Sequence, residues 1–341
     1  MKKLKGAVFG CGFWSQFQIG GWTELPEVEI VALYNRTIGK AREKAEMFNI
    51  QHYYDNAEKL LQNHPEIDFV DIITDVDTHS NFVELAAIYK KNVICQKPMA
   101  PNLDTARKMV QVCRENAVKY YVHENYRWQP QFRRIKQLMD QGVIGRPFRC
   151  LTGFNTAFPL FETQPFLAQL EQFALTDQGS HQFDVLRFFF GEAESLYCST
   201  QQVNPTIKGE DVATTIIKTK SGVTCIQEIS FSSLLEREVF PQTLLLIEGS
   251  KGSIRLDPDM VIKITTSTGT VTENVPLDKY GWQTERLTNE PPSIVSCNKN
   301  IMEDMLGINV AETTGDDNLK TVELVFAGYD SAKKNEVIKF S

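Results

Sequence analysis

The sequence predicts a protein of the α/β class, with a doubly wound parallel sheet in its N-terminal part and an α+β domain with a mostly antiparallel sheet in its C-terminal part. Two observations lead to this expectation. Strands alternate with helices over residues 4–122, and strands follow one another directly from residue 147 onward. A chain of 341 residues also exceeds the roughly 250–300 residues at which a single core stops growing. We therefore expect two domains, residues 1–122 and 123–341.

The composition is that of an ordinary globular protein, with 42% hydrophobic and 23% charged residues. A net charge of −7 offers no electrostatic footprint for nucleic acid, and no basic amphipathic helix points to a membrane surface. The first apolar run is too short for a signal peptide, so a cytoplasmic location is expected. The cysteines number seven, lack Cys-x-x-Cys spacing, and favour reduced thiols with no metal site.

The N-terminal part alternates short apolar or β-branched runs with helical patterns, as parallel βαβ units do. Strands are expected at Ala7–Gly10, Glu29–Tyr34, Phe69–Thr74, Asn92–Cys95 and Lys119–Val122. Helices are expected at Ile38–Asn49, Thr78–Lys90 and Leu103–Asn116. Such sheets bind ligands in the crevice outside the carboxyl ends of their strands, so the loops that follow strands are the first candidates for a site.

The first strand runs into Gly10–Ser15, a G-x-G-x-x-S variant of the dinucleotide-binding fingerprint. Gly10 permits the tight turn, Gly12 lets the backbone approach a pyrophosphate, and the helix that follows directs free N–H groups at the anion. Alternatively, the two glycines serve the backbone geometry of the corner alone. The strand before and the helix after favour a Rossmann dinucleotide-binding domain in residues 1–122, with cofactor contacts from Gly10, Cys11, Gly12, Phe13 and Trp14.

The second strand ends in Asn35 and Arg36, where an acidic residue normally binds the ribose 2′-hydroxyl of NAD. A carboxylate would repel a 2′-phosphate, whereas an arginine forms a forked contact with it. Asn35 and Arg36 therefore favour NADP(H), with NAD(H) still open. The alternative is that Arg36 only begins the next helix.

The strand Phe69–Thr74 is followed by a helix start. Asp77 or Thr78 suits the N-cap, which would place His79 in the first turn at the crevice, beside Thr74. Thr74 and His79 are therefore candidate cofactor contacts. Equally, His79 is a solvated residue at a helix start.

The apolar run that begins at Asn92 stops at Lys97, which precedes Pro98. A strand that ends there delivers a cation to the sheet edge where ligands bind, and the fixed φ of proline stiffens the turn that presents it. Lys97 is therefore a candidate for catalysis. The alternative is one more solvated lysine after a strand.

Residues 123–130 form the expected crossing between the domains. Tyr126 and Arg127 there either line a substrate cleft or pack an interface, and the sequence favours neither. Beyond it, strands with turn residues between neighbours are expected at Phe148–Asn155, Ser195–Val203, Asp211–Lys220, Gly222–Phe231, Gln242–Glu248 and Gly252–Leu256. The chain ends with an expected helix at Asn318–Ala332 and a short strand at Val337–Phe340.

One strongly patterned helix lies inside this β-rich part. Thr176 suits its N-cap and Gly191 its C-terminal stop. Asp177 and His181 are four residues apart and are expected on one helix face, where the carboxylate would raise the basicity of the imidazole as a general base needs. The alternative is a capping aspartate and an unrelated interface histidine.

These motifs together resemble the Gfo/Idh/MocA family of NAD(P)-dependent oxidoreductases, and the resemblance extends along nearly the whole chain. The family's cofactor loop is matched by Gly10–Ser15 and the end of its Thr-Pro-Asn…His segment by Thr78 and His79. Cys95–Pro98 resembles its Glu-Lys-Pro signature with Gln96 in the place of the glutamate, and Asp177–Asp184 resembles its Asp-x-Gly-x-His-x-x-Asp segment.

The resemblance implies a Rossmann domain followed by an α+β domain whose large open sheet forms oligomer contacts, hence a homodimer or homotetramer. It also implies reversible oxidation of a secondary hydroxyl on a sugar, sugar acid or cyclitol. His181 would take the hydroxyl proton, Lys97 would hold the same oxygen, and Asp177 would orient His181 or contact the substrate.

Cofactor contacts from Gln96 and Lys97, and substrate contacts from Tyr126 and Arg127, follow from the same resemblance. Two other functions fit the same motifs. One is a glycoside-cleaving enzyme that uses the bound cofactor transiently, and the other is a non-catalytic nucleotide-sensing regulator.

Overall fold

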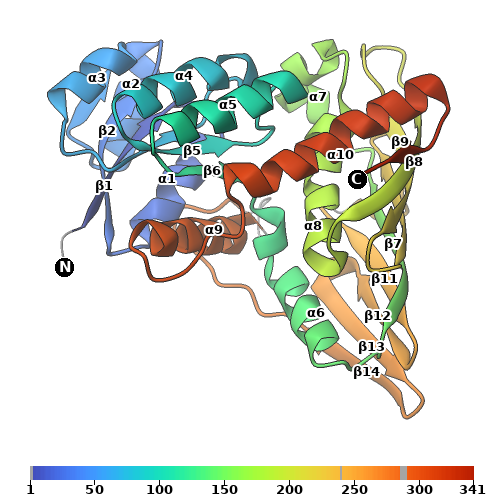
Figure 1. Cartoon of the computed structure of the whole chain (residues 1–341). Coiled ribbons are helices and arrows are strands. Elements are labelled where there is room, and N and C mark those ends of the chain that lie inside the picture. The colour runs from blue at the N-terminus through green and yellow to red at the C-terminus, as the bar shows by residue number, and fades with distance from the viewer. Residues whose placement is uncertain (1–2, 239, 285–289) are drawn as a thin grey trace. The chain divides into compact units, whose positions relative to one another are not determined.

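A computed structural model describes residues 3–238, 240–284 and 290–341 (Figure 1). The chain forms two compact units. The first comprises Met1–Trp128 and Asp278–Val322, and the second Gln129–Leu277 and Glu323–Ser341. The division into units differs from the expected boundary at residue 122 in two ways. The first unit extends to Trp128, and it also includes residues 278–322 from the C-terminal part of the chain.

A six-stranded parallel sheet forms the centre of the first unit, in the order β3-β2-β1-β4-β5-β6. This is the doubly wound order of a dinucleotide-binding sheet, and it confirms the predicted fold class. The strands are β1 (Leu4–Phe9), β2 (Val28–Tyr34), β3 (His52–Tyr54), β4 (Phe69–Ile72), β5 (Asn92–Gln96) and β6 (Tyr120–His123). The strand order reverses between β1 and β4, and there the carboxyl ends of the strands leave a crevice for ligands.

The helices of the first unit cover its sheet, as Figure 1 shows for α2, α4 and α5. They are α1 (Ser15–Thr23), α2 (Ile38–Met47), α3 (Ala57–Asn63), α4 (Val76–Ile88), α5 (Leu103–Glu115), the 3₁₀ turn η1 (Tyr126–Trp128) and α9 (Glu290–Met305). Strands β4 and β6 are buried at every position, as expected for parallel strands covered on both faces.

Helix α9 explains why the first unit reclaims a distant segment. Cys297 and Ile301 of α9 are fully buried in one core cluster with Trp22, Phe69 and Tyr121. Burial of such side chains is worth about 1.5–3 kcal/mol each, so the core of this unit is incomplete without the segment.

A second buried feature of this unit is polar. Trp22 donates its indole N–H to Asp71 Oδ2 at 2.7 Å, and Gln18 donates its amide to the same oxygen at 3.1 Å. Complete burial raises the pKa of the Asp71 carboxyl to about 7, against the smaller lowering effect of these two bonds.

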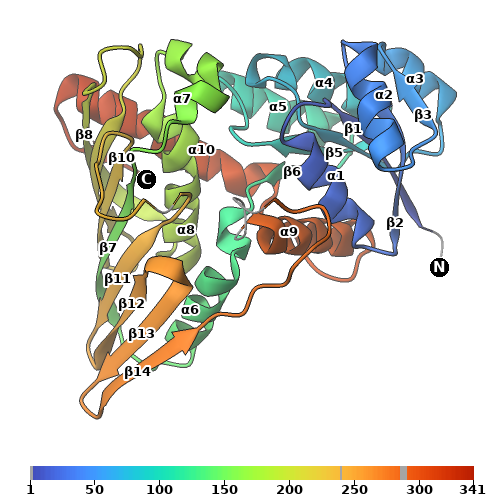
Figure 2. The ribbon, with the colours of Figure 1, turned by 180° about the vertical axis from the view of Figure 1, so that it is seen from behind.

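The second unit contains a nine-stranded sheet in the order β14-β13-β12-β11-β7-β10-β9-β8-β15, seen from behind in Figure 2. Among the described residues of this sheet, β7 and β10 are the one pair that runs in parallel, so the sheet is mostly antiparallel, as predicted. Its strands are β7 (Pro147–Asn155), β8 (Ala193–Gln201), β9 (Val212–Thr219), β10 (Thr224–Ser230), β11 (Leu244–Gly249), β12 (Gly252–Asp257), β13 (Val261–Thr266), β14 (Gly269–Asn274) and β15 (Ile338–Lys339).

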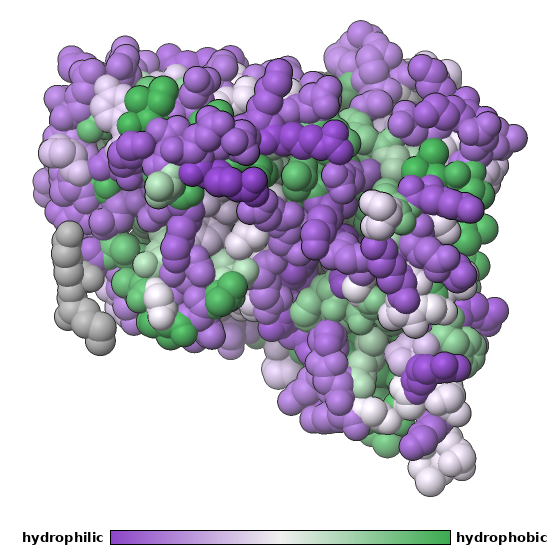
Figure 3. Space-filling model, viewed as in Figure 1, coloured by the Kyte–Doolittle hydropathy of each residue, from purple (hydrophilic) through white to green (hydrophobic). Residues whose placement is uncertain are grey.

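Alternating burial along β9 shows that one face of this sheet packs inward and the other faces outward. The unit also contains α6 (Pro130–Asp140), α7 (Leu160–Thr163), the 3₁₀ helix η2 (Pro165–Gln169), the π-helical turn η3 (Leu175–Gly179), α8 (Ser180–Phe190), the 3₁₀ turn η4 (Pro258–Met260) and the part of α10 (Gly315–Lys334) from Glu323 on. Most of the surface drawn in Figure 3 is hydrophilic, with small hydrophobic areas between. Among the described helices, none combines the length and apolarity needed to cross a membrane.

Candidate active site

The glycine loop after β1 has the geometry of a dinucleotide site. Gly10 has φ +105°, and a Cβ there would lie 2.6 Å from the carbonyl oxygen of Ile73, so only glycine fits. Apart from its two chain neighbours, a Cβ on Gly12 would meet no atom of the described residues within 4 Å. The space above Gly12 is therefore open, as the approach of a pyrophosphate to the backbone requires.

Hydrogen bonds hold this loop against its neighbours. The backbone N–H of Cys11 donates to Asn35 Oδ1 at 3.0 Å, and the Ser15 hydroxyl donates to the Gly12 carbonyl at 2.6 Å. Helix α1 begins without a side-chain cap or an acidic residue in its first turn, which suits an anion. Burial raises the pKa of the Cys11 thiol to about 12, so it stays protonated and packs as an apolar group. These residues fit a dinucleotide.

Arg36 is exposed at the end of β2, and its guanidinium lies 3.4 Å from the carboxylate of Asp75, which follows β4. The side chain of Asn35 makes two hydrogen bonds: its Oδ1 accepts from Cys11, and its amide N–H donates to the Thr37 carbonyl at 3.1 Å. Asn35 thus braces the glycine loop, and the cation expected to meet a 2′-phosphate has an anion beside it.

His79 is buried and braces two strand-end loops. Its Nε2 lies 3.0 Å from the Thr74 carbonyl oxygen and its Nδ1 lies 3.3 Å from the Met99 carbonyl oxygen. Burial lowers the pKa of the imidazole, and a neutral ring has a single N–H to donate to either carbonyl. Of the two alternatives for His79, the solvated residue at a helix start is therefore wrong, and the cofactor contact stays a prediction.

The start of α4 also differs from the expected one. The helix begins at Val76, with Asp75 at the N-cap position, rather than at a cap formed by Asp77 or Thr78. Asp75 has the extended backbone of an N-cap residue, and the Thr78 hydroxyl donates to the Asp75 carbonyl at 2.7 Å and to the Thr74 hydroxyl at 2.8 Å. Thr78 therefore acts inside the first turn.

Lys97 directly follows β5 at the carboxyl edge of the sheet, as predicted, and it is half-buried. The side chain of Gln96 folds back, so that its Oε1 accepts the backbone N–H of Lys97 at 2.9 Å. Gln96 Nε2 is buried and has no hydrogen-bond partner within the part of the chain that the structure describes. Gln96 thus fixes the backbone at the lysine.

The carboxylate that interacts with Lys97 belongs to Glu124, a residue that the sequence reasoning missed. Glu124 directly follows β6 and is completely buried. Burial raises the pKa of its carboxyl to about 7, while the positive charges of Lys97 and, to a smaller extent, Arg127 lower it. The sequence did contain a signal for this residue, because an acidic residue directly follows the strand that pairs with β5.

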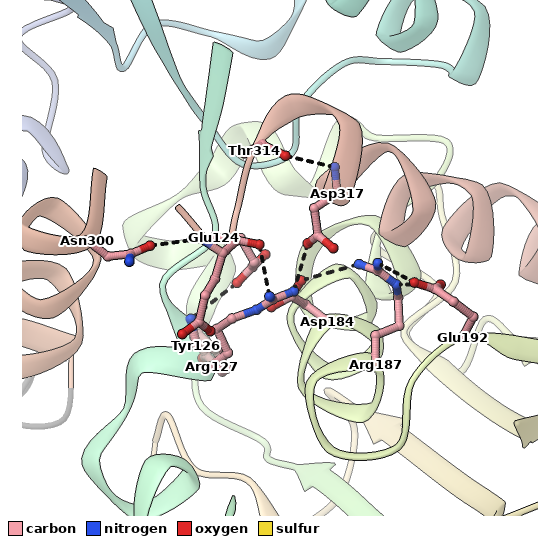
Figure 4. A network of polar contacts seen from close by, with 10 residues as sticks. Glu124, Tyr126, Arg127, Asp184, Arg187, Glu192, Asn300, Thr314 and Asp317 are labelled. Atoms are coloured by element: carbon pink, nitrogen blue, oxygen red, sulfur yellow. Dashed lines mark hydrogen bonds and ion pairs between the residues drawn. The ribbon is translucent and has the colours of Figure 1, made fainter. Parts of the chain in front are cut away.

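Arg127 is buried in a polar network that ties η1 to the C-terminal segment of the first unit (Figure 4). Its guanidinium donates to Asp317 Oδ2 at 3.0 Å and to the Glu312 carbonyl at 3.1 Å. The Asp317 backbone N–H donates to the Thr314 hydroxyl at 3.2 Å. Arg127 therefore has structural partners, and its contact with substrate, like that of Tyr126, stays a prediction.

The second unit contains Asp177 and His181. Asp177 lies in the π-helical turn η3 and is half-buried, whereas His181 lies in the first turn of α8 and is 3% exposed. π-Turns are frequent at functional sites. The pairing of Asp177 with His181 was argued from α-helical spacing and stays a prediction.

Of the two predicted ends of this helical stretch, the N-terminal one is wrong and the C-terminal one is confirmed. Thr176 is not its N-cap, because the helical turn already includes Leu175 and the Thr176 hydroxyl donates to the carbonyls of Gln172 and Phe173. Gly191 ends α8 with φ +79°, as predicted. Inside α8, Arg187 pairs with Asp184 and with Glu192 of the following loop, at 3.9 and 3.0 Å (Figure 4).

The predicted site residues are thus divided between the units. The first unit holds the glycine loop, Asn35, Arg36, Thr74, His79, Gln96 and Lys97 at strand ends of one sheet edge, with Tyr126 and Arg127 in η1. The second unit holds Asp177 and His181. Among the described ranges, no cluster of His, Cys, Asp and Glu side chains forms a metal site.

The parallel sheet with its open glycine turn defines the first unit as the dinucleotide-binding part of an α/β enzyme. Residues 4–124 match the family model described as "Oxidoreductase family, NAD-binding Rossmann fold", and residues 132–255 match the "GFO/IDH/MocA C-terminal domain". The chain belongs to the Gfo/Idh/MocA family of oxidoreductases.

Similar proteins cover the chain almost completely. It is 37% identical over 339 residues to a D-apiose dehydrogenase of Paraburkholderia graminis, covering 99% of this chain and 90% of the relative. It is 35% identical to a D-apiose dehydrogenase of Rhizobium rhizogenes, covering 99% and 98%. A solved oxidoreductase from Agrobacterium radiobacter, in complex with NAD+, L-tartaric acid and magnesium, superposes with a TM-score of 0.96 at 35% identity, covering 99% and 98%. The protein is an NAD(P)-dependent oxidoreductase.

Proposed function

We propose that this enzyme oxidises a CH–OH group of a sugar and that D-apiose is its substrate. The observation that carries the proposal is the identity of 37% and 35% with two D-apiose dehydrogenases over 99% of this chain. The residues with reactive chemistry, Lys97, Asp177 and His181, are present in the motifs that the family resemblance assigns to catalysis.

The glycine loop would hold NAD(P), which would supply the acceptor for the hydride of the carbinol carbon. His181 accepts the proton of the hydroxyl group as the C–O bond gains double-bond character, and Asp177 orients His181 or contacts the substrate. Lys97 holds the same oxygen and stabilises its developing negative charge, a role worth roughly 3–4 kcal/mol for comparable donors. The product is a ketone, or a lactone where the reacting hydroxyl is anomeric.

Cofactor contacts are proposed for the glycine loop (Gly10, Cys11, Gly12, Phe13 and Trp14), for the strand-end residues Asn35, Thr74 and His79, and for Gln96 and Lys97. Arg36 supports a preference for NADP(H), because its guanidinium is exposed where a 2′-phosphate would lie. Two observations support NAD(H) instead: Asp75 places a negative charge beside Arg36, and the Agrobacterium relative was solved with NAD+. We propose that Arg36 gives a preference for NADP(H) and that the negative charge of Asp75 reduces it.

The second unit corresponds to most of the expected domain of residues 123–341. We propose that it binds substrate and that it forms a homodimer or homotetramer. Large apolar side chains exposed on its sheet support association, namely Phe148, Ile216, Leu244 and Val271. Light scattering coupled to gel filtration measures the mass, and a monomer contradicts this part of the proposal. The proposed location is cytoplasmic.

The activity is tested by incubating the purified protein with D-apiose and either NAD+ or NADP+ and following the absorbance of reduced nicotinamide. D-Xylose, myo-inositol and a sugar acid serve as comparison substrates. We expect the highest kcat/KM with D-apiose. Release of a sugar from a glycoside without net reduction would indicate the glycoside-cleaving alternative. Cofactor binding without turnover of any substrate would indicate the nucleotide-sensing regulator.

A further inference from the structure

The ends of β5 and β6 place a lysine and a glutamate at neighbouring positions of one sheet edge. The two strands pair in parallel, with Gln96 opposite His123. Lys97 and Glu124 each follow these partners directly in the chain, so both lie just beyond the carboxyl ends of neighbouring strands. In parallel strands, side chains at matching positions point to the same face.

Glu124 is a buried carboxyl group with defined neighbours. Its side chain is 0% exposed, and its Oε1 accepts the backbone N–H of Tyr126 at 3.3 Å. Two cations interact with it, Lys97 more strongly than Arg127. Arg127 has a carboxylate partner of its own in Asp317, at 3.0 Å. A buried carboxylate is costly unless a cation compensates it, and Lys97 provides the larger compensation.

The residue before the lysine cannot provide this charge. Gln96 is neutral, and its Oε1 is bonded to the Lys97 backbone rather than directed to a side chain. The Glu-Lys-Pro signature of the family has a glutamate at this position. In this chain, a carboxylate for Lys97 must therefore come from another residue.

We propose that Glu124 is the positioning residue of Lys97, supplying from β6 the carboxylate that Gln96 lacks on β5 and thereby holding the ammonium in place toward the substrate oxygen. The inference rests on the proposed role of Lys97 in the proposed function. Its chemical content is electrostatic: Glu124 stays unreacted, and no proton or electron leaves the substrate through it.

A double-mutant cycle tests the pair without any turnover. Thermal unfolding is compared for Lys97→Met, Glu124→Gln and the double variant, with no substrate present. Lys97→Met alone leaves the buried Glu124 without its stronger cation, so we expect a lowered Tm that Glu124→Gln restores in the double variant. Lys119→Met, directly before β6, is the matched control. Its Tm shift and that of Glu124→Gln should be additive. Additive Tm shifts for Lys97 and Glu124 would overturn the proposal.

A second-site substitution tests the catalytic consequence in the enzyme with substrate. We expect Glu124→Gln to lower kcat about 10-fold or more, with the KM for the cofactor unchanged, because a displaced Lys97 loses part of its interaction with the transition state. Gln96→Glu added to Glu124→Gln places a carboxylate oxygen where the partnerless Nε2 lies, and it should recover most of kcat. A purely structural Glu124 would give no such recovery, and that result contradicts the proposal.

Two further outcomes separate this proposal from the proposed function. If Glu124→Gln does not fold, Glu124→Asp with and without Gln96→Glu gives the same comparison of kcat. If the wild type turns over no sugar but the unfolding cycle shows coupling, the pairing of Lys97 with Glu124 stands and the proposed substrate is wrong. If the wild type is active and the cycle is additive, the substrate stands and the pairing is wrong.

Discussion

The guanidinium of Arg36 and the carboxylate of Asp75 join the loops after β2 and β4 by an ion pair of 3.4 Å. Both side chains are mostly exposed, at 79% and 74%, so the pair itself contributes little to stability. Its significance lies in the cofactor: a dianionic 2′-phosphate would be attracted by one partner and repelled by the other.

Substitution of the two residues should therefore change NADPH binding in opposite directions. Arg36→Ala removes charge-assisted hydrogen bonds of roughly 1.5–3 kcal/mol, so the Kd for NADPH should rise about 10-fold or more. Asp75→Asn removes the repulsion, so NADPH should bind a few-fold tighter. The Kd for NADH, measured by fluorescence titration, is the internal control and should change little. A similar rise for both cofactors with Arg36→Ala would show that Arg36 does not read the 2′-position.

The two glycines of the cofactor loop should respond differently to the same added methyl group. Gly10→Ala forces a Cβ against the Ile73 carbonyl at positive φ and should cost roughly 1–3 kcal/mol of unfolding free energy. Gly12→Ala meets no atom of the described residues apart from its two chain neighbours, so stability should stay within about 0.5 kcal/mol while the Kd for NADH rises at least about 10-fold. Denaturant unfolding and calorimetric titration measure the two effects. An unchanged Kd for Gly12→Ala would remove the loop from the cofactor site.

Removal of the proposed acid–base and electrostatic groups should lower kcat without unfolding the protein. We expect Lys97→Ala to reduce kcat by about 10²–10³ and His181→Ala by about 10²–10⁴. Lys108→Ala, an exposed lysine on α5, is the control and should retain full activity. Turnover by Lys97→Ala equal to that of the wild type would contradict the catalytic role of Lys97.

The buried Asp71 predicts a pH dependence of stability. The pKa of its carboxyl is about 7 in the folded chain and 3.8 when unperturbed, so the folded chain binds the proton more tightly. The contribution is therefore fully present below about pH 4 and is lost as the pH rises through about 7. Three pKa units set an upper limit of roughly 4 kcal/mol.

Asp71→Asn keeps a neutral side chain that accepts from Trp22 and Gln18 at every pH. We expect it to be more stable than the wild type at pH 8 and to lose that advantage at pH 5, by chemical denaturation at both values. An equal difference at the two pH values would show that Asp71 does not titrate in this range.

Local pattern was sufficient to predict five of the six strands of the parallel sheet and the position of Lys97, because these strands are short, mostly apolar runs with a loop directly after them. Strand β3 was not predicted, because its three residues are mostly exposed and form no apolar run. The glycine loop and Gly191 were predictable for the same reason, since a positive φ limits the choice of residue.

Other features depend on contacts between distant segments. Helix α9 was not predicted, because it starts with two prolines and buries polar Asn298 and Asn300 beside its apolar residues, which obscures the helical period. Strands β13 and β14 were also missed. β14 is almost entirely exposed and so lacks the alternation of apolar and polar residues that marks a strand. Glu124 was passed over because its relation to Lys97 appears only once β5 and β6 lie side by side.

The return of residues 278–322 to the first unit constrains the order in which the chain acquires its structure. Domains generally fold as units during synthesis, the N-terminal one first. Here the ribosome completes every strand of the nine-stranded sheet except β15 before it makes α9. The core cluster of Trp22, Phe69 and Tyr121 is therefore complete only after Cys297 and Ile301 have been synthesised. The dinucleotide-binding unit cannot finish folding until most of the chain has left the ribosome.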